Sequence, residues 1–418
     1  MSKIRIKNFG PIKEGFSETL PDGSINEWID IKKVTVFIGN QGSGKSTVAK
    51  LISTFMWIEK SLINGKISEL NEEDFIEEYC NYFRLKNYFK PTSEIIYEGE
   101  YCNISYLNQQ ISHDLIERQE AYHMPKIMYV PAERSFLGSV EGADKVTGLP
   151  QPLVTFMVEN DRSLIELNES ISLPFGDYTI RFDSSKNLSF ISGADYELEL
   201  TAASSGLHSA VPLFVVSRNL SYILASGKSD SSISDLNSRQ LQKRSNELRS
   251  ARLSFIVSDN DIDKANIQRL EDIIESKYKN SLFVNIVEEP EQNLFPTSQR
   301  KMLNSLLEFN NLSTGNKLIM TTHSPYLINY LTLCVKAEMV KSNMNSDDSF
   351  NKIAEIVPLE STVKADDLVI YELNEMLGTI KKLEDYKGLP SDDNELNSEL
   401  EDSNELFAQL QEIEKGWR

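Results

Sequence analysis

A glycine-rich segment constrains the fold of this 418-residue chain more than any other feature. Residues 39–46 read Gly-Asn-Gln-Gly-Ser-Gly-Lys-Ser and fit the pattern GxxxxGK(S/T). The apolar run Val34–Ile38 before it predicts a buried strand, and apolar residues between Val48 and Met56 recur at helical spacing after it. A strand, a glycine loop and a helix in this order are the context in which the pattern binds nucleotide phosphates.

The chemistry of the pattern explains its residue types. Glycines let the backbone curl so that successive N–H groups point at the phosphates, and the helix N-terminus adds partial positive charge. Lys45 is expected to bridge the β- and γ-phosphates, Ser46 to ligate Mg²⁺, and Thr47 to reach the α-phosphate. The predicted nucleotide-binding residues are Gly39, Asn40, Gln41, Gly42, Ser43, Gly44, Lys45, Ser46 and Thr47.

Two further segments place polar side chains where an apolar strand ends. The run from Leu282 ends in Glu288 and Glu289, as in a Walker B element. There, Glu288 is expected to hold Mg²⁺ and Glu289 to position or deprotonate the attacking water. His323 follows the apolar run from Lys317, where a neutral imidazole can reach the γ-phosphate or the water. Taken alone, these residues also fit a solvated acidic strand end and an ordinary core or surface histidine.

In this order the three elements resemble the ATP-binding-cassette superfamily, specifically its soluble branch of SMC, RecF and OLD-type ATPases. The resemblance covers about residues 1–331 and implies binding of ATP and Mg²⁺. It also implies that Ser204, Ser205 and Gly206, which precede an apolar helix, form the signature loop that caps ATP held by the other protomer. Without the family, these residues read as a helix N-cap.

Three departures from the family pattern are visible. Glu288 stands where the family usually has aspartate, and Leu207-His208 replaces the Gly-Gln of transporter ATPases. Gly206 and Glu288 are also much farther apart than in transporter subunits, which disfavours a transporter ATPase.

Two positions stay open. The glutamine that contacts Mg²⁺ in this superfamily could be Gln109 or Gln110, whose surroundings read equally well as an exposed insertion. Arg134 lies in a segment that resembles OLD-like and defence-associated ATPases. It could touch phosphate, couple subunits, or make a plain strand-end contact.

The fold class predicted is α/β, an ABC-type ATPase head with a mostly parallel sheet, helices on both faces and an antiparallel side sheet. Residues 177–200 are expected to form the side sheet's hairpins. The core is expected over residues 1–375, with insertions at about 60–124 and 226–280, followed by an acidic, partly helical tail over 376–418. The parallel strands are expected at 34–38, 127–130, 282–287, 317–321 and 368–373.

The charge and the cysteines limit the partners. Lysine and arginine number 43 against 63 aspartates and glutamates, a formal net charge of −20, which repels nucleic acid and anionic lipid. DNA contact would need a local patch, for which the basic cluster Arg239–Arg252 is the candidate. No apolar run approaches the ~20 residues that span a bilayer. The three cysteines are far apart in the sequence, which makes a disulfide framework unlikely. Together with the lack of a membrane span, this predicts a cytoplasmic protein.

Three functions compete. The first is an ATP-dependent switch that forms a homodimer or higher oligomer and controls a separate effector, a nuclease or toxin; the resemblance implies a role in anti-phage defence. The second is a RecF- or SMC-like DNA-repair ATPase, and the third a scaffold that binds ATP without hydrolysing it. The acidic tail, which has no lysine or arginine between Pro390 and Glu414, favours a protein partner.

Overall fold

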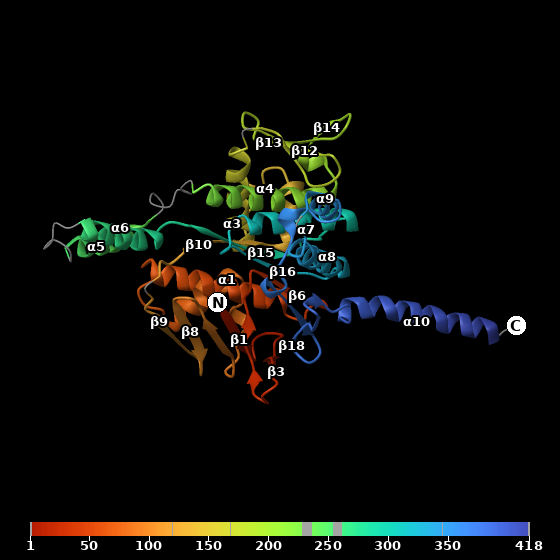
Figure 1. Cartoon of the computed structure of the whole chain (residues 1–418), viewed down its shortest axis with the longest axis horizontal. Coiled ribbons are helices and arrows are strands. Elements are labelled where there is room, and N and C mark those ends of the chain that lie inside the picture. Colours follow the sequence, from red (N-terminus) through yellow and green to blue (C-terminus); the bar gives the residue numbers. More distant parts are fainter. Residues whose placement is uncertain are drawn as a thin grey trace.

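A seven-stranded sheet runs through the middle of the molecule, with helices on both faces (Figure 1). The structure, a computed structural model, describes residues 2–118, 120–167, 169–227, 236–253, 261–344 and 346–416. Five neighbouring strands are parallel, β18 is antiparallel to β17, and β2 pairs with β18. In spatial order the strands are β10 (Pro125–Val130), β15 (Leu282–Glu288), β16 (Lys317–Thr321), β6 (Val34–Gly39), β17 (Leu368–Asn374), β18 (Thr379–Lys382) and β2 (Gly15–Phe16). The five parallel strands predicted from apolar runs are therefore confirmed.

The two faces of this sheet belong to two hydrophobic clusters. In β6, Val36 and Ile38 pack with the helices on one face, whereas Phe37 packs toward α1 (Lys45–Ile63) on the other. Successive side chains of a strand point to opposite faces, so a strand covered on both sides is apolar throughout. This is why the strand before the glycine loop has no polar alternation.

An antiparallel sheet packs on the far side of α1 (Figure 1). Its order is β5 (Ile29–Asp30), β1 (Lys3–Lys7), β7 (Glu94–Glu98), β8 (Cys102–Leu107) and β9 (Gln110–Leu115). Ile4 and Ile6 of β1 are buried, as the alternation of that strand predicts. Because β7 pairs along all of β1, the strands between residues 60 and 124, expected to lie in an insertion, complete a sheet that the N-terminus begins.

Helices cover the opposite face of the central sheet, and a four-stranded antiparallel sheet lies beyond them (Figure 1). The hairpins expected over residues 177–200 are confirmed. The helices are α2 (Ser135–Ser139), α3 (Gln151–Ile165), α4 (Ser205–Ala225), α7 (Pro296–Asn311), α8 (Pro325–Lys341) and α9 (Asp347–Ala354). The outer strands are β11 (Ile171–Ser172), β12 (Thr179–Asp183), β13 (Leu188–Ser192) and β14 (Glu197–Glu199).

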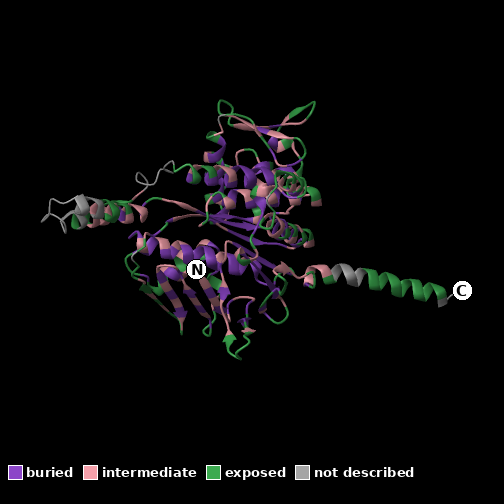
Figure 2. Ribbon diagram, viewed as in Figure 1, coloured by how far each residue is buried: buried purple, intermediate pink, exposed green. Residues whose placement is uncertain are grey.

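Three helices project from this body. The pair α5 (Ser238–Leu253) and α6 (Asp261–Ser276) leaves on one side, and α10 (Glu395–Gly416) on the other, where much of its surface is exposed (Figures 1 and 2). The tail was expected to begin at residue 376, but β18 belongs to the central sheet, so the projecting helix begins only at Glu395. Short strand pairs are β3 (Glu18–Thr19) with β4 (Ile25–Asn26) and β19 (Asp385–Tyr386) with β20 (Leu389–Pro390). Among the described residues, no helix has the length and apolar character needed to cross a membrane.

Candidate functional site

The carboxyl ends of the parallel strands meet at one edge of the central sheet. Glu288 at the end of β15 is paired with Thr321 of β16, and Thr321 is paired with Phe37 of β6. Since ligands of open α/β sheets bind at this edge, the register gathers the predicted residues at the expected place. One strand, β16, separates the glycine-loop strand from the acidic strand.

The glycine loop is shaped by backbone angles that favour glycine. Gly39 has φ +134°, and a Cβ there would lie 2.3 Å from the Leu373 carbonyl oxygen of β17. Gly44, with φ +103°, is the residue that precedes α1. Because both angles lie in the region that L side chains rarely adopt, these two glycines fix the curl of the loop.

Lys45 turns back onto this loop. Its Nζ donates to the carbonyl oxygens of Gly39 and Asn40, each at 2.7 Å. Burial lowers the pKa of the ammonium to about 8, although Glu289 and Glu291 oppose the shift by favouring the charge. Carbonyl oxygens are weaker acceptors than phosphate oxygens, so the side chain is placed to exchange them for a phosphate.

The remaining loop residues differ in exposure. Asn40, Gln41 and Gly42 are exposed, Ser43 and Thr47 are buried, and Ser46 is partly exposed in the first turn of α1. The Asn40 amide donates to Glu375 Oε1 at 3.1 Å, which ties the loop to the turn after β17.

Glu288 is buried and held on both oxygens. The Tyr129 hydroxyl of β10 donates to Oε1 at 2.5 Å, and the Ala132 N–H donates to Oε2 at 3.1 Å. Burial and then the charge of Glu288 raise the pKa of Tyr129, so the phenol keeps its proton and remains a donor. Lys50 of α1 lies 3.8 Å from Oε1.

The donor set suits magnesium. Mg²⁺ prefers oxygen ligands and commonly takes one or two from the protein, with phosphates and water as the rest. Glu288 and the Ser46 hydroxyl supply such oxygens, and each Glu288 oxygen keeps acceptor capacity beyond its one hydrogen bond. No cluster of three or more potential metal-ligating side chains occurs in the part of the chain that the structure describes.

Glu289 and His323 face each other. His323 Nε2 lies 3.5 Å from Glu289 Oε1. Burial and then the charge of Glu288 raise the pKa of Glu289, whereas burial and then the charge of Lys45 lower the pKa of His323. A carboxylate of increased basicity beside a neutral imidazole is an arrangement that can take a proton from water.

The backbone of Glu289 is unusual as well. Its φ is +44°, and its N–H donates to the Thr321 carbonyl oxygen at 2.9 Å. A left-handed conformation at a residue other than glycine is strained and persists only where its surroundings hold it, which is common at functional sites.

Glu291 has a role that the sequence reasoning did not assign. Its Oε1 accepts from the Thr322 hydroxyl at 2.7 Å and from the His323 N–H at 2.8 Å. Glu291 therefore fixes the segment that carries the imidazole. A signal was present in the sequence, since Glu291 is the third carboxylate in Glu288-Glu289-Pro290-Glu291.

Arg134 is fully buried, and its guanidinium donates to backbone carbonyls. The acceptors are Glu288 at 2.6 Å, Glu289 at 2.5 Å, Pro131 at 3.2 Å and Ser209 at 3.1 Å. Burial lowers the pKa of the guanidinium to about 10, while Glu291 and Glu289 favour its charge. Arg134 thus links the acidic strand end to α4 as a positioning residue.

The predicted signature residues lie at the start of α4. Ser204 and Ser205 are exposed, and a Cβ on Gly206 would come within 2.8 Å of the Asn293 carbonyl oxygen. The Asn293 amide in turn donates to Ser209 Oγ at 3.0 Å. The start of α4 therefore packs against the segment that follows the acidic strand, whereas Ser204 and Ser205 are open to solvent.

Gln109 and Gln110 lie at a hairpin. Gln110 pairs with Leu107, and Asn108 and Gln109 have φ values of +52° and +61°. Both glutamines are exposed. They form the turn between β8 and β9 and the first residue of β9.

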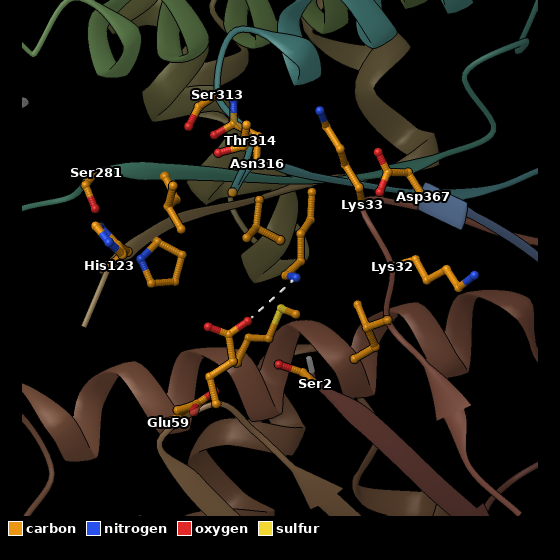
Figure 3. Close-up of a pocket in the computed structure, with 18 of the residues that line it drawn as sticks. Ser2, Lys32, Lys33, Glu59, His123, Ser281, Ser313, Thr314, Asn316 and Asp367 are labelled. Carbon is orange, nitrogen blue, oxygen red and sulfur yellow. Dashed lines mark ion pairs between the residues drawn. The ribbon is translucent and has the colours of Figure 1, made fainter. Parts of the chain in front are cut away.

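A cavity of about 710 Å³ lies at the opposite end of the parallel strands, where β15 and β16 begin (Figure 3). Its walls carry both charges. Lys317 pairs with Glu100 at 3.8 Å, and the buried Glu59 accepts from the Tyr97 hydroxyl and the Tyr101 N–H. Burial raises the pKa of Glu59. This cavity is separate from the edge that holds the glycine loop.

The fold and the site define a P-loop nucleotide-binding protein: a glycine loop between a strand and a helix, beside an acidic strand end. A family model described as an AAA ATPase domain matches residues 1–285 and 264–328. The chain belongs to this AAA ATPase domain family, which confirms the class of ATPase that the motifs indicated.

Solved structures with similar folds include SMC and ABC domains. The SMC head domain from Thermotoga maritima is 10% identical, with 92% of this chain and 98% of that chain covered and a TM-score of 0.35. The Pyrococcus furiosus Smc head domain with an extended coiled coil, bound to the C-terminal domain of ScpA, is 10% identical (98% and 100% covered, TM-score 0.34). A nucleotide-free ATP-binding cassette from an ABC transporter is 12% identical (93% and 93% covered, TM-score 0.25). No curated protein matches the chain.

Proposed function

We propose that this chain binds ATP with Mg²⁺ and hydrolyses it as a nucleotide-dependent dimerising switch. The observation that carries the proposal is the position of Glu289 and His323, 3.5 Å apart and within electrostatic reach of Lys45. A glycine loop that only bound nucleotide would not need a basic carboxylate and a neutral imidazole beside it.

Each residue of the site has its own proposed role in binding or hydrolysis. Lys45 leaves the carbonyls of Gly39 and Asn40 for the β- and γ-phosphates. Ser46 and Glu288 would hold Mg²⁺, which would neutralise charge on the phosphate oxygens. Glu289 accepts the proton of the attacking water, and His323 orients that water or the γ-phosphate.

The dimer is proposed from the exposure of Ser204 and Ser205. Hydroxyls and N–H groups at a helix N-terminus suit an anion, and here they face solvent. In a two-fold dimer they would cap the γ-phosphate held by the other protomer. Arg134 joins the start of α4 to the carbonyls of Glu288 and Glu289, so capping and hydrolysis share one rigid connection.

A separate effector protein, a nuclease or toxin, is proposed as the partner that the switch controls, and anti-phage defence as its setting. The resemblance to defence-associated ATPases supports this. DNA binding through the basic cluster is less well supported, because Arg244 pairs with Glu275 and Lys243 donates to the Ile63 carbonyl. Among the side chains of the cluster that the structure describes, those of Arg239 and Arg249 are exposed. The Arg252 side chain lies outside the described residues.

Mixing two inactive variants tests the composite site. Lys45→Ala removes the phosphate ligand, and Ser205→Glu places a carboxylate where the γ-phosphate of the other protomer would lie. A one-to-one mixture contains heterodimers with one intact site, so phosphate release should return to at most about a quarter of the wild-type rate. Ser205→Ala removes one capping hydroxyl without adding a charge, so it should slow phosphate release less than Ser205→Glu does. No recovery in the mixture contradicts the trans-acting site.

A further inference from the structure

An aromatic cavity of about 280 Å³ lies away from the glycine loop, between α1, the π-helical segment Asp74–Cys80, β10 and α3. Five of the residues that line it are aromatic, and three others carry hydroxyl groups. Its lining residues are Ser53, Thr54, Trp57, Glu78, Tyr79, Tyr82, Phe83, Ile127, Tyr129 and Thr155.

The aromatic walls are braced against each other. Trp57 and Tyr79 have ring centroids 5.3 Å apart, and Phe83 lies 4.7 Å from Tyr129. The Tyr82 hydroxyl donates to Thr155 Oγ1 at 2.7 Å, which joins two sides of the cavity. Braced aromatic walls preserve an open space for a flat ring, which they bind through offset stacking and edge contacts.

The charged groups that line the cavity indicate which class of ligand it can bind. Among the described residues that line the cavity, none is a lysine, arginine or histidine, and the one ionisable carboxylate is Glu78. Close to the lining, Lys66 Nζ lies 4.7 Å from the Trp57 ring centroid. An amino or ring N–H group in the cavity could donate to Glu78 or to the hydroxyls. The volume is at the lower end of ligand pockets, which suits a ligand of one or two rings.

One wall of the cavity is also part of the acidic strand end. Tyr129 lines the cavity, and its hydroxyl donates to Glu288 Oε1 at 2.5 Å. A ligand ring stacked beside Tyr129 would therefore contact the side chain that orients Glu288. The π-helical segment opposite is a rare conformation that often marks functional sites.

We infer that this cavity binds a planar heteroaromatic group with amino or N–H donors, of the nucleobase class, and that its binding alters ATP turnover through Tyr129 and Glu288. The binding stands on the cavity alone, whereas the effect on turnover rests on the proposed function of Glu288.

Trp57 supplies the readout for binding. The chain has three tryptophans, so a Trp28→Phe, Trp417→Phe background leaves Trp57 as the reporter. Adenosine, guanosine and cytidine are titrated to about 5 mM, which covers dissociation constants into the millimolar range. At least one should change the Trp57 emission with saturation. The same nucleosides are measured against the wild-type protein by saturation-transfer NMR.

Two substitutions locate the site. Tyr79→Ala removes a stacking wall, and Thr155→Tyr fills the rim; each should weaken binding by about tenfold or more. The matched control is Ile165→Tyr, on the same helix but outside the cavity, which should leave binding unchanged. The absence of binding by all three nucleosides, or binding indifferent to both cavity substitutions, overturns the inference.

Steady-state ATPase measures the coupling separately. The nucleoside that binds should change the wild-type rate severalfold, and Tyr129→Phe should retain its binding while losing that response. Binding without any change in rate overturns the coupling. Binding to a protein that shows no ATPase activity would instead contradict the proposed function and leave the cavity assignment standing.

Discussion

Replacing Glu291 with alanine should destabilise the protein and slow ATP turnover together. The carboxylate is buried, and its Oε1 accepts from the Thr322 hydroxyl and the His323 N–H at 2.7 and 2.8 Å. Alanine leaves both donors without this acceptor. Each buried donor left unsatisfied costs about 1–3 kcal/mol, and water that enters the vacated space reduces the cost. We therefore expect the free energy of unfolding to fall by about 2–4 kcal/mol.

Urea denaturation measures this change, and phosphate release measures the effect on turnover. The control is Glu291→Gln, because the amide oxygen can still accept both hydrogen bonds. Among the described residues, Glu291 Oε2 accepts no hydrogen bond, so exchanging that oxygen for nitrogen breaks none. The new amide N–H groups lack an acceptor at the buried Oε2 position, so we expect Glu291→Gln to lose about 1–2 kcal/mol, less than Glu291→Ala. If Glu291→Ala unfolds like the wild type and hydrolyses ATP at the same rate, Glu291 does not position the His323 segment.

Two further predictions concern Arg134 and Lys45. Arg134→Lys keeps the charge, but an ammonium cannot reach the carbonyls of Ser209, Pro131, Glu288 and Glu289 together. The free energy of unfolding should therefore fall by about 2 kcal/mol or more, and kcat should fall further than the affinity for ATP. A variant as stable as the wild type would contradict the role of the guanidinium. Burial lowers the pKa of Lys45 to about 8 in the free protein, and only the protonated form binds phosphate well. The dissociation constant for ATP, measured by calorimetry, should therefore rise by up to about tenfold per pH unit above pH 8. A constant value up to about pH 9.5 would argue against Lys45 as the phosphate ligand.

The sequence predicts best those features that depend on neighbouring residues. The glycine loop, its strand and its helix are contiguous, and the apolar runs before Glu288 and His323 could only be buried strands. Their meeting at one edge follows from the rule for parallel sheets, and the register confirms it.

Features that depend on distant contacts were not predicted. Strands β7–β9 read as an insertion because their partner β1 lies at the start of the chain. The role of Glu291 requires β15 and β16 to be neighbours, and that of Arg134 requires the start of α4 to approach β15. Gln109 and Gln110 could not be separated from an exposed turn by pattern, and the structure places them at a hairpin.

Glu289 is proposed to be the base when this chain hydrolyses ATP. The most direct test is single-turnover hydrolysis by Glu289→Gln, with ATP binding measured in parallel. Binding should be retained while hydrolysis slows by about 10²-fold or more, because the amide cannot accept the proton. Hydrolysis at the wild-type rate in a variant that binds ATP normally would contradict this role of Glu289.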